Sequence, residues 1–177
     1  MGSTVTPLRF TRLVAHAAAL ACTALLLSYS VLQPAWADEG PFAGFAGQWS
    51  GTGTVRVKKG DTQTAERIRC TANYRLRGGH GVDLQLGCKS DNYNVDLSGE
   101  FDADDSGHFS GRWTEHSRNV GGTAIGTVRA GTIELHIESS AFAADMSLTT
   151  RGRRQSISLD SHGAGQVVTG SITLQRN

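Results

Sequence analysis

The first 37 residues have no acidic side chain and only two basic ones, Arg9 and Arg12. The stretch from Leu13 to Leu32 is almost wholly apolar, and Ala35-Trp36-Ala37 then places small residues where signal peptidase requires them. The pattern predicts a signal peptide over residues 1–37, cleaved after Ala37. The mature protein would then be located in the periplasm or outside the cell.

Two other interpretations of this leader stay open. Its apolar run is long enough, at roughly 20 residues, for a membrane-spanning anchor. Cys22 could instead be acylated as in a lipoprotein, although Ala19 stands where such a site carries leucine. We expect the leader to be cleaved. No membrane span is then expected in the mature protein.

The remaining chain lacks an excess of positive charge. Of the 17 Lys and Arg residues, two belong to the leader, so the mature chain has 15 basic and 16 acidic side chains. No basic stripe suits nucleic acid, and the densest basic cluster, Arg151-Gly152-Arg153-Arg154, fits a solvated turn. The 140 residues suffice for one core. We expect a short N-terminal extension over residues 38–44 and a single domain over residues 45–177.

Common catalytic and metal-binding patterns are missing as well. There is no His-x-His pair or Glu-x-x-His spacing of the kind that holds zinc. There is no Gly-x-Ser-x-Gly nucleophile elbow and no Walker-type phosphate loop. The sequence therefore predicts a non-enzymatic protein with no metal and no cofactor.

Alternating apolar and polar residues recur along the chain, separated by Gly, Asp, Asn and Ser. No comparable pattern recurs at helical spacing. Short strands joined by short turns predict an all-β fold, an antiparallel up-and-down barrel of about 8–10 strands with little helix. Charged residues such as Arg56, Asp83 and Arg112 fall on the outward face, so a water-soluble barrel is expected rather than a transmembrane one.

Pairing of apolar side chains predicts the register of the first long hairpin. Folding the chain about Gly79 matches Leu76 with Val82 and puts Cys70 directly opposite Cys88. An even number of cysteines in an exported chain favours a disulfide between these two. Two buried free thiols are the alternative.

Three later hairpins follow from the same reasoning. The predicted pairs are Phe101 with Phe109, Gly99 with Gly111, Leu97 with Trp113 and Val95 with Glu115 around residues 104–107; Val128 with Ile133 around Ala130-Gly131; and Leu148 with Ile157 around Gly152-Arg153.

Several inward-facing positions could serve a ligand. Glycines recur there, and they either let the strands bend or leave a hollow; they are Gly51, Gly53, Gly99, Gly111, Gly126 and Gly170. Glu66 and Glu115 also face inward, either as polar contacts or as residues at a wet rim. The candidate ligand-binding residues are Trp49, Glu66, Tyr74, Trp113 and Glu115.

Gly47-Gln48-Trp49 resembles the Gly-x-Trp of calycin and lipocalin barrels, and Trp49-Ser50-Gly51-Thr52-Gly53 also resembles nitrobindin-like domains. This resemblance implies a calycin-like barrel in which the tryptophan closes the floor and a small, mostly apolar ligand is held inside. Ala46-Gly47-Gln48-Trp49 is also similar to the start of periplasmic inhibitors of secreted metalloproteases. In that family the segment before the barrel enters the protease, which implies a protein partner for residues 38–44 as an alternative.

Overall fold

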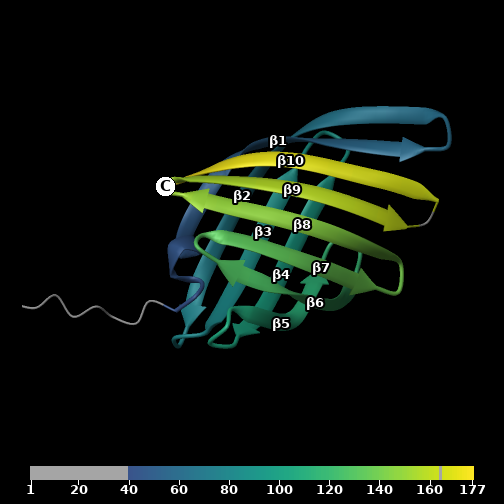
Figure 1. Cartoon of the computed structure of the whole chain (residues 1–177). Coiled ribbons are helices and arrows are strands. Elements are labelled where there is room, and N and C mark those ends of the chain that lie inside the picture. Colours follow the sequence, from purple (N-terminus) through teal and green to yellow (C-terminus); the bar gives the residue numbers. More distant parts are fainter. Residues whose placement is uncertain (1–39, 164) are drawn as a thin grey trace, which may run out of the picture. The chain divides into compact units, whose positions relative to one another are not determined.

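Ten antiparallel strands close into one barrel (Figure 1). The computed structural model describes residues 40–163 and 165–177. Each strand pairs with its neighbours in the chain, and the last returns to pair with the first. The strands are β1 (Gly47–Lys59), β2 (Thr62–Arg77), β3 (Gly81–Lys89), β4 (Asn94–Ala103), β5 (His108–Glu115), β6 (Val120–Arg129), β7 (Thr132–Ser139), β8 (Phe142–Arg151), β9 (Arg154–Gly163) and β10 (Gln166–Arg176).

The predicted all-β, up-and-down barrel is therefore confirmed. Its helical content in the described residues is one 3-10 turn, η1 (Ala43–Phe45), just before β1. None of the described helices is long and apolar enough to cross a membrane. The predicted leader, its cleavage after Ala37, and Cys22 lie outside the described residues.

The register of the first long hairpin is confirmed. Leu76 pairs with Val82, and Cys70 pairs with Cys88. The two cysteines form a disulfide. The pairs predicted for the turns at residues 130–131 and 152–153 are also present. Alternation of apolar side chains therefore suffices to align these strands, since a slip by one residue would turn every core side chain outward.

The predicted register between β4 and β5 is wrong. Phe101 pairs with Gly111, not with Phe109, which instead faces Ala103, and Glu115 faces Leu97 rather than Val95. The turn is responsible. The carboxylate of Asp104 accepts hydrogen bonds from the backbone N–H groups of Ser106 and His108, and Gly107 has a φ of 81°. The turn lies at residues 104–107 as predicted, but these contacts move the centre of the hairpin from Asp105 to Ser106. Each side chain keeps its predicted face.

Several inward glycines lie where the backbone of the neighbouring strand leaves no room for a side chain. A Cβ on Gly51 would lie 2.0 Å from the carbonyl oxygen of Thr173, and one on Gly111 would lie 2.0 Å from that of Glu100. A side chain at either position would collide with the neighbouring strand, so these positions require glycine. Gly170 differs, because its nearest neighbour would be the Leu159 side chain at an ordinary 3.4 Å.

Candidate functional site

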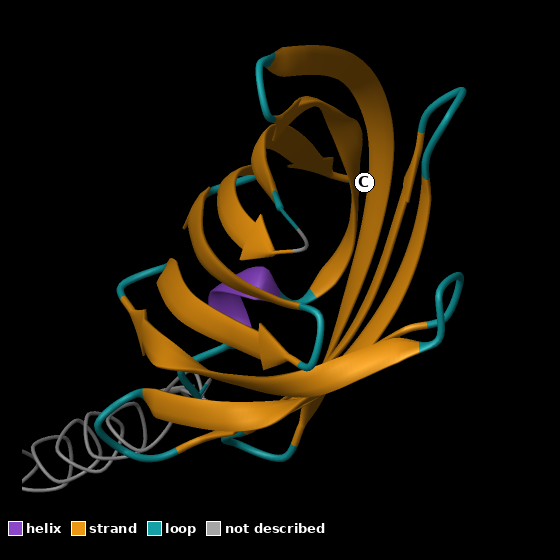
Figure 2. Cartoon of the chain, turned by 90° about the vertical axis from the view of Figure 1, so that its right-hand side faces the viewer, coloured by secondary structure: helices purple, strands orange, loops and turns teal. Residues whose placement is uncertain are grey.

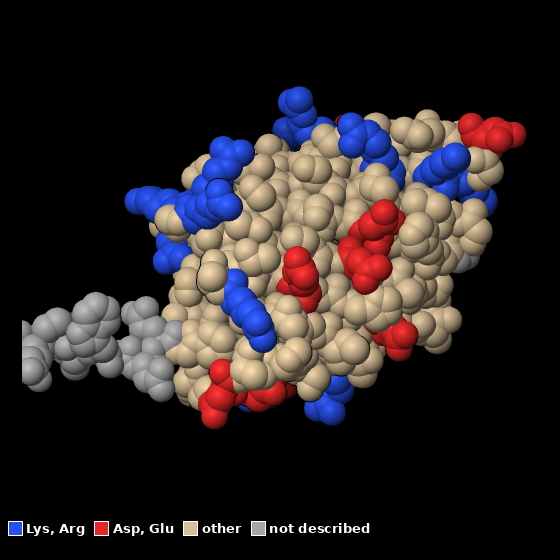
Figure 3. Space-filling view, viewed as in Figure 1, with Lys and Arg blue, Asp and Glu red and all other residues tan. Residues whose placement is uncertain are grey.

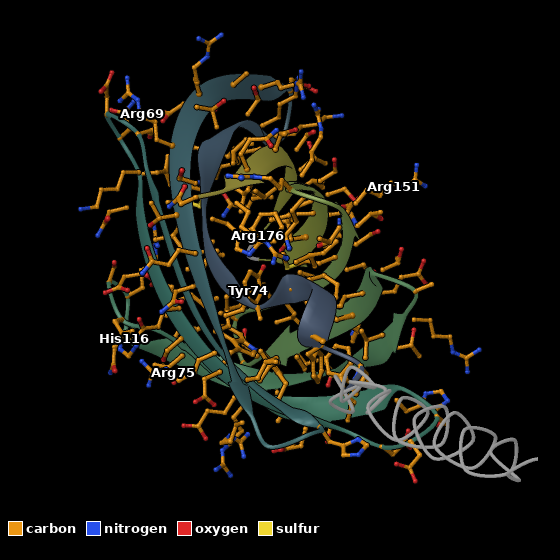
Figure 4. The ribbon with its side chains drawn as sticks, turned by 90° about the vertical axis from the view of Figure 1, so that its left-hand side faces the viewer. Arg69, Tyr74, Arg75, His116, Arg151 and Arg176 are labelled. Atoms are coloured by element: carbon orange, nitrogen blue, oxygen red, sulfur yellow. A yellow bond between two sulfur atoms is a disulfide. The ribbon has the colours of Figure 1, made fainter. Side chains whose placement is uncertain are left out.

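The 3-10 turn η1 lies across the interior at one end of the barrel (Figures 2 and 4). Buried aromatic side chains pack around it and close this end. Trp49 and Phe45 are both 0% exposed. The indole N–H of Trp49 donates to the carbonyl of Phe45 at 2.8 Å. The guanidinium of Arg176 lies 4.6 Å from the Trp49 ring and donates to the carbonyl of Gly44 at 2.6 Å. The first and last strands together therefore fix η1 in place.

The segment before η1 is part of this closure. Phe42 is 2% exposed and meets Phe109 edge to face at 5.6 Å between ring centroids. Gly40 lies so close to the β2–β3 turn that a Cβ there would overlap the carbonyl oxygen of Gly79. The described part of the predicted extension, residues 40–44, is thus packed on the barrel.

A polar network lies within the closed end. The hydroxyl of Tyr74 donates to Oε1 of Gln155 at 3.0 Å, and the Gln155 amide donates to the Thr150 hydroxyl at 3.1 Å. Burial raises the pKa of Tyr74, and its bond to Gln155 offsets this only in part. Because Gln155 is 0% exposed and its amide is engaged on both sides, the network holds three strands together.

The opposite end of the barrel is open. Several inward-facing apolar side chains there are half-buried, so water reaches part of the inner wall, although Ile68, Cys88 and Ile137 are buried. The half-buried ones include Val55, Val95, Leu97, Val120 and Phe142. Trp113 stands next to this region, with its ring 5.7 Å from that of Phe142 and its N–H donated to the carbonyl of Thr123 at 3.2 Å. A half-buried apolar wall inside a barrel is suited to an apolar molecule.

Glu115 holds the β5–β6 turn at the open rim. Its carboxylate accepts backbone N–H bonds from Asp96 and Ser117 at 3.0 Å and from Arg118 at 2.8 Å. Burial works against ionisation of Glu115, but these donors outweigh it and hold its pKa below the ordinary value. Both oxygens are thus engaged by the protein itself.

Glu115 should therefore make stability depend on acid. Because its folded pKa is lowered, its contribution is complete above the ordinary unfolded value of about 4.3 and is lost as pH falls through the folded pKa. We expect Glu115→Gln to lose about 1–2 kcal/mol of unfolding free energy near neutral pH, because the amide N–H₂ faces backbone donors. Denaturant unfolding between pH 7 and pH 2 should show that the difference in unfolding free energy between the wild type and Glu115→Gln becomes smaller as the pH falls. A difference that stays constant would contradict the assignment.

Glu66 plays a similar part at the β3–β4 loop. Its two carboxylate oxygens accept from the Ser90 hydroxyl at 2.6 Å and the Asn92 amide at 2.8 Å. The Ser90 hydroxyl in turn accepts from the N–H of Tyr93 at 2.9 Å. Glu66 therefore fixes residues 90–93 at the rim.

The five predicted ligand contacts thus separate into two groups. Trp49 and Tyr74 lie in the closed end, whereas Glu66, Trp113 and Glu115 lie towards the open one. Sequence reasoning missed Gln155 and Arg176. Gln155 could have been noticed, since it occupies an inward position in the alternation that continues with Ile157 and Leu159.

The outer surface of β7–β9 carries acidic side chains (Figure 3). The histidines His136 and His162 lie beside acidic residues on this surface. Asp145 in β8 pairs with Asp160 in the neighbouring strand β9. Nδ1 of His136 lies 2.8 Å from the carboxylate of Asp145. The hydrogen bond to Asp145 raises the pKa of His136 against a smaller effect of burial. Among residues 40–163 and 165–177, no group of three or more His, Cys, Asp or Glu side chains is placed to hold a metal ion. We read the contact as local charge compensation between opposed carboxylates.

Comparison with solved structures places the fold. Rv2717c from M. tuberculosis is similar, with a TM-score of 0.62, 16% identity, and coverage of 77% of this chain and 94% of that one. EF1p2_mFAP2b bound to DFHBI follows at a TM-score of 0.44, with 13% identity and coverage of 76% and 94%. The ywiB protein from Bacillus subtilis follows at 0.37, with 13% identity and coverage of 74% and 92%.

At 16% identity, the likeness to Rv2717c shows a shared fold and no more. No family model matches the chain. No curated protein matches it either. The closed antiparallel barrel fits the calycin-like architecture that Gly47-Gln48-Trp49 led us to expect.

Proposed function

We propose that this chain is an exported, non-enzymatic binding protein that takes a small, mostly apolar ligand into the open end of its barrel. The observation that supports this most is the contrast between the two ends. Aromatic side chains fill the closed end, whereas the inward wall of the open end keeps apolar side chains such as Leu97 and Val120 within reach of water. Each 100 Å² of apolar surface removed from water there would contribute about 2.5 kcal/mol.

The polar groups at the open end favour a ligand with few polar groups of its own. Glu66 and Glu115 are engaged by rim loops, and the Trp113 N–H by a backbone carbonyl. A strongly polar ligand would lose bonds to water and find few replacements. Trp113 with Phe142 is the pair we assign to ligand contact, and Trp49 and Tyr74 are assigned to closure.

The disulfide supports export. Cys70 and Cys88 are bonded and buried, and such bonds persist in oxidising compartments. Together with the predicted leader, this favours a site of action in the periplasm or outside the cell. A protein partner acting through residues 38–44 is not part of the proposal, because Phe42 lies buried against the barrel.

Gly170→Leu tests the proposal. Its side chain has room to enter the open interior, between Leu159 and Val55, without meeting backbone. We expect titration with the uncharged fluorophore N-phenyl-1-naphthylamine to give saturable binding to the wild-type protein, weakened at least tenfold, about 1.4 kcal/mol, in the variant.

Gly87→Leu is the matched control. Gly87 lies in β3 on the outer face, where a Cβ would meet only the Thr71 hydroxyl at 3.5 Å. This variant should bind the fluorophore as the wild type does. Equal affinity in all three proteins, or loss in both variants, would place binding outside the barrel and overturn the proposal.

A further inference from the structure

Five uncharged polar side chains form a continuous row across the outer face of β1–β5. They are Gln48, Asn73, Gln85, Ser98 and Thr114, and each lies directly opposite the next in strand register. Adjacent strands lie about 4.8 Å apart, so the row extends about 19 Å over its four steps. We call this set the polar row.

A groove lies on each side of the polar row. One, of about 340 Å³, separates it from a row of charged side chains that includes Arg75 and Arg112. The other, of about 810 Å³, separates it from Thr71, Gly87 and His116. Arg75 and His116 lie outside the barrel wall, unlike Tyr74, which points inward (Figure 4). Gly87 deepens the second groove, because it leaves an open position between Thr71 and Asp96.

Most of the polar row is free to bind. Within residues 40–163 and 165–177, Ser98 is its one member with a side-chain hydrogen bond, to Nε2 of His116 at 2.9 Å. Asn73 is half-buried. Each amide offers two donors beside an acceptor, and each hydroxyl offers both functions. Each member of the row therefore presents both a donor and an acceptor.

The grooves carry no net charge. Three basic side chains, Arg75, Lys89 and Arg112, are balanced by three acidic ones, Asp83, Asp96 and Glu100. These grooves would bind a polyanion only weakly, because proteins bind polyanions through an excess of Lys and Arg side chains. An extended peptide would need an unpaired strand edge, whereas the row lies on the face of paired strands.

We propose that the polar row with its two grooves binds an uncharged oligosaccharide laid across β1–β5. Sugar hydroxyls are donors and acceptors at once, which matches side-chain amides and hydroxyls. The strand spacing of about 4.8 Å is close to the length of one pyranose unit, so successive sugars meet successive members of the row. This site is separate from the proposed apolar site inside the barrel.

The test is an NMR titration of the isotope-labelled exported protein with cellohexaose, maltohexaose and N-acetylchitohexaose. We expect at least one of them to bind saturably, with a dissociation constant on the order of 1 mM, and to shift the amide signals of the polar row. The double variant Asn73→Ala/Gln85→Ala should weaken this binding at least tenfold. Gly87→Leu should do the same, because its side chain fills the groove.

Two controls distinguish the outer site from the interior. Gln63→Ala removes an exposed amide of β2 far from the row, and Gly170→Leu alters only the interior; both should bind the sugar within twofold of the wild type. Absence of saturable binding to all three sugars would overturn the proposal. So would preferential binding of anionic hexagalacturonate, or affinity that survives both Asn73→Ala/Gln85→Ala and Gly87→Leu. The fluorophore titration of the interior is unaffected by any of these results, so the two proposals fail separately.

Discussion

Replacing Trp49 with alanine is expected to lower the free energy of unfolding by about 3–5 kcal/mol. The side chain is 0% exposed, so its removal leaves a cavity at the centre of the closed end. It also removes the bond to the Phe45 carbonyl and the ring on which Arg176 rests. Loss of both contacts should loosen η1, which these residues hold across the barrel.

Denaturant unfolding followed by far-ultraviolet circular dichroism would measure this effect. Trp49→Phe is the graded control: it keeps an aromatic ring beneath Arg176 but cannot donate to Phe45, so we expect a loss of about 1–2 kcal/mol. A loss below 1 kcal/mol for the alanine variant would show that the closed end does not depend on Trp49.

Removing the disulfide should have the second largest effect. Cys70 and Cys88 are 18 residues apart, and closing a loop of this size lowers the entropy of the unfolded chain enough to stabilise the fold by about 3 kcal/mol. We expect the double variant Cys70→Ala/Cys88→Ala to lose about this much. Both cysteines are also buried, so the lost sulfur contacts add to the effect.

Reductant provides an internal control for this prediction. Dithiothreitol should lower the free energy of unfolding of the wild type by a comparable amount. It should not change the free energy of unfolding of the double variant. Equal stability of the wild type with and without reductant would mean that the bond contributes nothing to the exported protein.

Sequence periodicity predicted strand number and most registers because barrel strands bury one face. The Cys70–Cys88 pair followed from apolar neighbours, without any prior assumption of a disulfide. The β4–β5 register failed for a local reason. The carboxylate of Asp104 organises its own turn together with Gly107, and alternation in the strands does not report this.

The candidate site was less accessible to sequence reasoning. Alternation correctly placed Glu66 and Glu115 on the inward side, but it could not reveal that rim loops occupy their oxygens. Those partners, such as Ser90 and Arg118, lie in loops whose course depends on tertiary structure. The role of Arg176 was hidden for the same reason, since its contact with Trp49 joins residues 127 positions apart.

The segment before the barrel shows a further limit. Residues 38–44 were predicted as an extension because they precede the first strand and contain Pro41. Phe42, and Phe45 just beyond the segment, were the available signals of burial, since each is an apolar residue spaced to face one side of a single turn. In the structure both fill the closed end.

Native mass spectrometry of the protein after export tests the central claim most directly. We expect the wild type and Gly87→Leu each to appear as the disulfide-bonded chain beginning at Asp38. Each should carry an apolar adduct from the host or take up added N-phenyl-1-naphthylamine in one-to-one ratio. Gly170→Leu should appear as the same chain without either species. Identical adducts on Gly170→Leu, or a wild type that carries neither species at saturating fluorophore, would contradict a ligand site in the open end of the barrel.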